Sequence, residues 1–318
     1  MMMTEVSTAS SHPAGEVRKM NRIVDLTFNL QERMLLTSIP ICAVGLIGNG
    51  AIFWLLCCKV KIKLSLYFFS VTVANLLIIF CNFVIIILYF AQITPRLIFQ
   101  RVMQILHICG YDTSFYMFTG VAVERCCSIY FPDWYRSHRP NNFSHFGVSI
   151  LWGLSFMVSF VDYYACFPRF QINFHVFFVA CRTSTIMEII IELIIFFPII
   201  FSCTLAIWIR IPKRKEGTLR ARLDITIVAM VLLFLILNAP LRIAHILTFW
   251  IHKIDTYMLQ NISLLMDSLN STCNPLVYFF VGNWEWQKSS APIHAFLEKA
   301  LKAEESKPEG TERGQAQA

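Results

Sequence analysis

The chain has 318 residues, of which 56% are apolar and only 15% are charged, and its formal net charge is +7. Soluble domains carry about a quarter charged residues, so this composition argues against a water-soluble two-domain enzyme. The basic residues lie mostly in short loops between apolar segments, where they flank a membrane, and this placement argues against binding to nucleic acid.

Seven apolar stretches each supply the roughly 20 residues that a helix needs to cross a hydrocarbon core of about 30 Å. In chain order they cover Met34–Cys58, Leu64–Ala91, Ile98–Tyr130, Phe143–Cys166, Thr183–Ile211, Leu223–Trp250 and Thr256–Val281. We therefore predict an all-α membrane protein, with a seven-transmembrane helix bundle over residues 34–281 and the two chain ends on opposite sides of the bilayer.

Basic residues set the expected orientation of these spans. The loops after the first, third and fifth spans are rich in lysine and arginine, and the opposite loops carry fewer. Because loops rich in basic residues stay in the cytosol, we expect a multi-pass plasma-membrane protein. Residues 1–33 would form an extracellular N-terminus, and the C-terminus would be cytoplasmic.

The region after the last span carries two further signals. Trp284 and Trp286 precede an apolar stripe at helical spacing, formed by Ile293, Phe296 and Leu297. This pattern predicts a short amphipathic helix over 282–301 that lies on the lipids of the inner leaflet, with a frayed tail as the alternative. Residues 302–318 are rich in Glu, Lys, Gly, Gln and Pro, which predicts a disordered cytoplasmic tail.

Prolines interrupt three of the spans. Pro198, Pro240 and Pro275 lie inside the fifth, sixth and seventh spans, where each removes a backbone hydrogen bond and favours a kink. Three kinked helices in succession suggest a bundle whose parts can pivot. The alternative is that these prolines reflect only the general abundance of proline in membrane helices.

Ionisable residues inside the spans gather in the predicted extracellular half, which indicates a polar vestibule that opens outward. Besides Asp112 and Glu192, the candidate ligand-binding residues there are His107, Asp162, Glu188, Arg242 and Asp267. An ion pair between Arg242 and Asp267 is the favoured structural alternative for those two, because an unpaired arginine at this depth is costly. Asp162 and Glu188 lack an obvious cationic partner outside the loops, so they are the best candidates to meet a positively charged ligand.

Four short motifs fall at matching depths in the spans. They are Gly48-Asn49 in the first span, Glu124-Arg125-Cys126 at the end of the third, Trp152 in the fourth, and Asn274-Pro275-Leu276-Val277-Tyr278 at the end of the seventh. Each is weak alone, but together and in this order they are specific. From about Met34 to Leu301, the chain resembles a class A (rhodopsin-like) G-protein-coupled receptor.

The resemblance implies roles for these residues and a heterotrimeric G protein as partner. Glu124 would hold Arg125 in an ion pair at rest, and Arg125 would face the cytoplasmic cavity once the sixth span, hinged at Pro240, swings outward. Tyr278 would then support Arg125, while Asn274 and Pro275 loosen the seventh span.

Departures from the class A pattern point to a narrower resemblance. Gln100 stands where most members place a bridged cysteine, and Asn238-Ala239-Pro240 lacks the usual tryptophan. These features, with the Phe131-Pro132-Asp133-Trp134-Tyr135 loop, look like the Mas-related receptor family. That resemblance implies a disulfide between Cys166 and Cys181. It also implies that acidic residues of the fourth and fifth spans recognise a cationic peptide or amine. Asp162 occupies the matching position on the fourth span, whereas Glu188 lies only near the matching position on the fifth.

Asn75 occupies the position where class A receptors usually place a sodium-binding aspartate. Asparagine carries no charge, so the resemblance implies an altered sodium site at Asn75 and Asn49 that binds sodium weakly or not at all. Elevated basal activity of the receptor is the expected consequence. The alternative is that Asn75 hydrogen-bonds Asn49 and Asn274 and changes little.

Other functional classes find less support. The sequence has no phosphate-binding loop, no His-Glu-x-x-His and no cysteine pairs at metal-ligand spacing, so we expect no enzyme activity, cofactor or metal site. A transporter or channel that uses buried acids is the main competitor, but the chain shows no similar halves of the kind common in transporters. A non-signalling scavenger receptor would lose the Arg125 motif, which this chain keeps.

Overall fold

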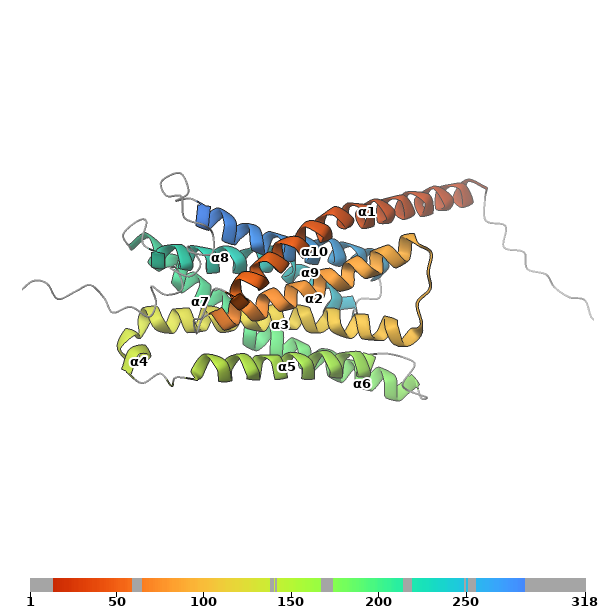
Figure 1. Ribbon diagram of the computed structural model, residues 1–318. Coiled ribbons are helices and arrows are strands. Elements are labelled where there is room, and N and C mark those ends of the chain that lie inside the picture. Colours follow the sequence, from red (N-terminus) through yellow and green to blue (C-terminus); the bar gives the residue numbers. More distant parts are fainter. Residues whose placement is uncertain are drawn as a thin grey trace, which may run out of the picture.

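The computed structural model describes residues 14–58, 65–137, 140, 142–166, 174–213, 219–248, 250 and 256–283. Within these residues all regular structure is helical (Figure 1), so the all-α prediction is confirmed. The predicted amphipathic helix over 282–301 lies outside them beyond Asn283, as do the tail 302–318 and residues 1–13 of the N-terminal segment.

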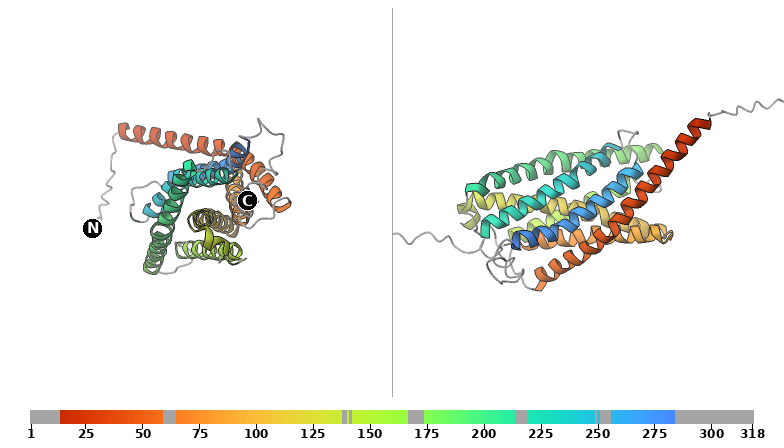
Figure 2. Two further views of the ribbon diagram at one scale, coloured as in Figure 1. Left: turned by 90° about the vertical axis from the view of Figure 1, so that its left-hand side faces the viewer. Right: turned by 90° about the horizontal axis from the view of Figure 1, so that it is seen from above.

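Seven helical spans form an elongated bundle, seen from two further sides in Figure 2. They are α1 (Ala14–Cys58), α2 (Ser65–Phe90), α3 (Leu97–Tyr130), α5 (Phe143–Cys166), the run α6 (Phe174–Glu188), η2 (Ile189–Phe196) and α7 (Phe197–Arg210), the pair α8 (Leu219–Leu237) and α9 (Ala239–Thr248), and α10 (Thr256–Asn283). Two short helices, α4 (Pro132–Ser137) and η3 (Ile211–Lys213), follow α3 and α7.

Within the described residues, five of the spans are long and apolar enough to cross a membrane by length and composition alone. They are Leu30–Cys57, Leu66–Phe90, Phe143–Cys166, Val179–Arg210 and Leu223–Ala244. The other two spans, α3 and α10, carry more polar residues, and both pack against several neighbours: α3 contacts α2, α5, α7 and α8, while α10 contacts α1, α2, α8 and α9. Most polar side chains in the middle of these two helices are buried, so they face protein and not lipid.

The outer surface of the bundle is apolar. Large side chains such as Ile47, Phe146 and Ile236 are more than two-thirds exposed, at 75%, 68% and 68%. Exposure of this extent would be unfavourable in water, but a bilayer covers such side chains without cost. The surface thus supports the predicted membrane location.

Two spans differ in extent from the prediction. α1 begins at Ala14 and not at Met34, and its first turns project beyond the other helices (Figure 1). The fifth span begins at Phe174 and not at Thr183. The remaining boundaries agree closely: α5 matches the predicted Phe143–Cys166.

The prolines distort the helices in different ways. Before Pro198 the fifth span widens into the π-helix η2, where the Phe197 amide donates to the carbonyl of Glu192. A wide turn of this kind accommodates a residue that has no amide hydrogen and whose ring would clash with the preceding turn. The sixth span breaks at Asn238, and Pro240 lies in the first turn of α9, whereas α10 continues through Pro275.

An aromatic core fills the centre of the bundle. Phe115 of α3 stacks on Phe234 of α8, with ring centroids 5.5 Å apart and ring planes at 9°. Tyr116 packs on Phe196 of η2 at 4.5 Å. This core separates the part of α3 that carries His107 and Asp112 from the part that carries Arg125.

Candidate functional site

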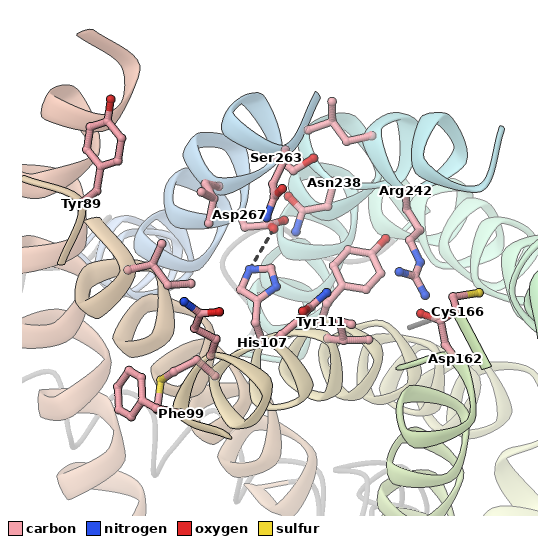
Figure 3. Close-up of a pocket in the computed structure, with 18 of the residues that line it drawn as sticks. Tyr89, Phe99, His107, Tyr111, Asp162, Cys166, Asn238, Arg242, Ser263 and Asp267 are labelled. Atoms are coloured by element: carbon pink, nitrogen blue, oxygen red, sulfur yellow. Dashed lines mark ion pairs between the residues drawn. The ribbon is translucent and has the colours of Figure 1, made fainter. Parts of the chain in front are cut away.

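A cavity of about 790 Å³ opens at the end of the bundle where α5 meets α6 (Figure 3). Its volume lies within the range of small-molecule sites. Side chains from α2, α3, α5, α6, α9 and α10 line it, and all five candidate ligand-binding residues are among them: His107, Asp162, Glu188, Arg242 and Asp267.

Arg242 of α9 is the centre of a buried ion cluster. Its Nη2 lies 3.1 Å from Glu188 Oε1, its Nε lies 3.2 Å from Glu192 Oε2, and Nη2 also lies 3.6 Å from Asp112 Oδ1. The Ser159 hydroxyl of α5 donates to Asp112 Oδ2 at 2.6 Å. One guanidinium thus joins α9 to α3, α6 and η2, and Glu188 and Glu192, one turn apart, face the same cation.

Two predictions about this region are wrong. Arg242 does not pair with Asp267, whose ion-pair partner is His107, with His107 Nε2 3.4 Å from Asp267 Oδ2. Glu188 has a cationic partner after all, in Arg242. The sequence prediction paired Arg242 with the neighbouring span because the rotation of α9, which turns Arg242 toward η2, is not encoded in spacing alone.

The cavity carries more acidic than basic groups. Five carboxylates lie in it or directly behind it (Asp112, Asp162, Glu188, Glu192 and Asp267), against Arg242 and the histidine His107. The guanidinium also lies over the ring of Tyr111, 5.3 Å from its centroid. Negative groups in a cleft with low-dielectric walls favour a positively charged ligand.

The structure contains the predicted disulfide between Cys166 and Cys181. It joins the last residue of α5 to α6, with the two Cα atoms 4.4 Å apart. Both cysteines line the cavity, as does Asp162, one turn before Cys166. The bridge therefore fixes the wall that carries Asp162.

At the opposite end of α3, Arg125 forms an ion pair through its Nε with Asp224 Oδ1 of α8, and both side chains are buried. Glu124, the predicted partner of Arg125, accepts hydrogen bonds from Tyr135 of α4 at 3.0 Å and from Ser144 of α5 at 3.0 Å. Sequence reasoning missed Asp224. Its signal was available, because Asp224 is the one acidic residue in the apolar stretch from Leu223 to Trp250.

The polar residues of the predicted sodium site lie between these two ends. Asn75 Oδ1 accepts a hydrogen bond from Ser114 at 3.5 Å, and Asn49 Nδ2 donates to the carbonyls of Gly45 and Ser271, both at 2.9 Å. The alternative in which Asn75 bonds Asn49 and Asn274 is wrong. The side chain of Asn274 is buried and finds no hydrogen-bond partner among the residues that the structure describes.

The remaining predicted activation residues lie near these groups. Tyr278 is buried, with its ring edge-on to Phe68 at 5.7 Å, and Pro275 packs near Gly48, where an added Cβ would come within 3.1 Å of the proline. Sequence reasoning also missed Asn238, which lines the cavity and is 1% exposed, with neither amide atom hydrogen-bonded to a described residue.

Comparisons of the sequence with known proteins identify its family. A family model for serpentine type 7TM GPCR chemoreceptors (Srx) matches residues 39–222. The chain is 29% identical over 271 residues to the proto-oncogene Mas of Rattus norvegicus, covering 83% of this chain and 82% of that protein. It is 28% identical to Mas-related G-protein coupled receptor member D of Mus musculus, covering 96% of each. With member X2 of Gorilla gorilla gorilla it shares 30% identity, covering 82% of this chain and 80% of the relative.

These matches extend over most of the chain and agree with the seven-span helical bundle of the structure. A receptor of this kind is a multi-pass plasma-membrane protein that links an extracellular ligand to a G protein. The chain therefore belongs to the Mas-related family of class A G-protein-coupled receptors.

Proposed function

We propose that the receptor binds a cationic peptide or amine in the cavity and activates a heterotrimeric G protein through an outward movement of α8. The surplus of carboxylates over cations in the cavity supports this ligand class more than any other observation. An anionic ligand would have to overcome that surplus with Arg242, whose guanidinium already contacts three acids.

The orientation follows from two independent features. A disulfide forms in an oxidising compartment, so the end with Cys166 and Cys181 would be extracellular. The basic loops predict the cytosol at the opposite end, where Arg125 lies. The cavity would then open to the outside, with the N-terminus extracellular, the C-terminus cytoplasmic and membrane lipids around the apolar surface.

The ligand would act by competing for the acids that hold Arg242. A cationic group that enters between Asp162 and Glu188 weakens the attraction of Glu188 for Arg242. This loosens α9 from the fifth span, and the break at Asn238 lets α9 move relative to α8. When α8 follows, Asp224 leaves Arg125, which then becomes accessible to the G protein.

Neutralising Asp162 tests the ligand class. Basic peptides and amines are screened on wild type and on Asp162→Asn, with nucleotide exchange on a G protein as the readout. An active basic ligand should lose about tenfold or more in potency, because a charge-assisted hydrogen bond contributes about 1.5–3 kcal/mol. Glu32→Gln is the matched control, since Glu32 is an exposed acid of α1 outside the cavity.

Two results would contradict the proposal. An activating ligand with negative or no charge, equally potent on wild type and Asp162→Asn, would reject the cationic class. Ligand-dependent current or uptake without nucleotide exchange would favour the transporter or channel.

A further inference from the structure

The cavity has acidic groups on two opposite walls. Asp162 lies on α5, which packs against α2, α3 and α6, whereas Asp267 lies on α10, which packs against α1, α2, α8 and α9. In Figure 3, Tyr111 stands between them, with the His107–Asp267 pair on one side and Asp162, Cys166 and Arg242 on the other.

Asp267 is short of hydrogen-bond donors. It is 5% exposed, and its one polar contact within the described part of the chain is His107 Nε2 at 3.4 Å. That nitrogen is buried and its geometry toward the carboxylate is too poor for a hydrogen bond. Buried carboxylates almost always accept several hydrogen bonds, so Asp267 is a nearly buried acid that faces the cavity without a donor.

Asp162, at the other wall, is half-buried and also lacks a hydrogen-bond donor. It lines the cavity and makes neither a hydrogen bond nor an ion pair with any residue that the structure describes. The nearby cation, Arg242, is already engaged by Glu188, Glu192 and Asp112. Among the described residues, Arg242 therefore attracts Asp162 only from a distance and without direct contact, and the histidine His107 is the one basic group that contacts Asp267.

We infer that the ligand carries two cationic groups, one bound at Asp162 and the other at Asp267, with the segment that connects them lying across Tyr111. The inference rests on the proposed cationic ligand class and narrows it to dications: a diamine, or a peptide with two basic side chains. The cavity suits an apolar connecting segment, since Tyr111 stands between the two acids and Ile108 and Leu241 also line the cavity.

The test uses straight-chain diamines of increasing length, each paired with the monoamine of the same carbon number. Binding is measured on the full-length receptor in lipid nanodiscs. The best diamine should bind at least about tenfold more tightly than its monoamine, because its second amine adds a charge-assisted hydrogen bond. A peptide with two arginines, compared with versions in which either is replaced by citrulline, tests whether the peptide backbone is also accepted.

Single substitutions assign the two ends. Asp267→Asn should remove the advantage of the diamine and leave the binding of the monoamine unchanged, whereas Asp162→Asn should weaken both. A charge reversal separates ligand contact from a structural role: Asp267→Lys should bind an ω-amino carboxylate more tightly than the diamine of the same length. A misfolded variant would bind neither.

Three outcomes would overturn the inference. If diamine and monoamine bind wild type equally, or if Asp267→Asn keeps their ratio while Asp162→Asn abolishes both, the cavity holds a single cation and the proposed function survives without the second site. If Asp267→Lys shows no reversal while the receptor still binds monoamines, Asp267 does not contact the ligand. If no basic probe binds at all, the cationic ligand class fails together with the inference.

Discussion

Neutralising Asp224 should raise the basal activity of the receptor. The Arg125–Asp224 ion pair joins α3 to α8, and its side chains are 2% and 0% exposed. Removing one partner of a buried pair costs about 3–5 kcal/mol when the other charge stays in place. Asparagine still accepts a hydrogen bond from the guanidinium, so the expected loss for Asp224→Asn is smaller, about 1.5–3 kcal/mol.

Only the resting arrangement bears this loss, because Arg125 leaves Asp224 in the proposed active arrangement. A resting state favoured by about 99 to 1 is favoured by about 2.7 kcal/mol. A loss of about 1.5 kcal/mol then raises the active fraction from about 1% to about 10%. We therefore expect basal nucleotide exchange to rise about tenfold.

The assay is ligand-free nucleotide exchange on a G protein, in membranes matched for the amount of receptor at the surface. Asp224→Glu keeps the charge and should stay close to wild type. Asp133→Asn removes an exposed acid of α4 near the same end of the bundle and should have no effect. Basal exchange of Asp224→Asn at or below the wild-type level would refute the view that this pair holds the resting state.

Three further substitutions probe the other polar groups. Asn75→Asp should lower basal exchange and make it sensitive to sodium; basal exchange that is unchanged and indifferent to sodium contradicts this. Arg242→Leu leaves buried carboxylates without their cation, at a cost of about 3–5 kcal/mol, so the thermal midpoint of the solubilised receptor should fall. Adding Glu188→Gln and Glu192→Gln should recover part of the lost midpoint. An unshifted midpoint in Arg242→Leu would show that the cluster does not stabilise the receptor. Cys166→Ser removes the disulfide between residues 15 apart in sequence, which should stabilise the fold by about 3 kcal/mol. The thermal midpoint of this variant should equal that of reduced wild type, and two different midpoints would contradict a stabilising disulfide.

The spans could be predicted because the bilayer imposes a length and a polarity on each of them. α5 has the predicted bounds Phe143–Cys166, and α10 begins at the predicted Thr256. The extra helix from Ala14 could not be predicted in this way, since residues 14–29 mix charged and polar residues with apolar ones and form no apolar stretch. The motifs and the disulfide were predictable from resemblance, which carries information that hydropathy lacks.

The ion pairs could not be predicted, because a pair depends on how each helix is rotated about its axis. Arg242 and Asp267 lie on consecutive spans, but α9 turns Arg242 toward Glu188 and Glu192. The π-helix at η2 changes the register of the fifth span at that point. A shift of one residue rotates a side chain by about 100°, so depth was predictable from sequence while partners were not.

The ion pairs also show how the two ends of the receptor can communicate. The α8–α9 span contacts α3 at three levels: Arg242 with Asp112 at 3.6 Å, Phe234 with Phe115 in the aromatic core, and Asp224 with Arg125. The two rings stay in apolar contact when they slide over each other, whereas the direct contact within each ion pair is lost when its groups move apart. The span can therefore turn about the aromatic level as a pivot. Asn238 breaks the helix between the aromatic pivot and Arg242. A ligand bound at the level of Arg242 must therefore move α9 far enough to carry α8 with it. A small displacement of α9 should leave Arg125 paired with Asp224.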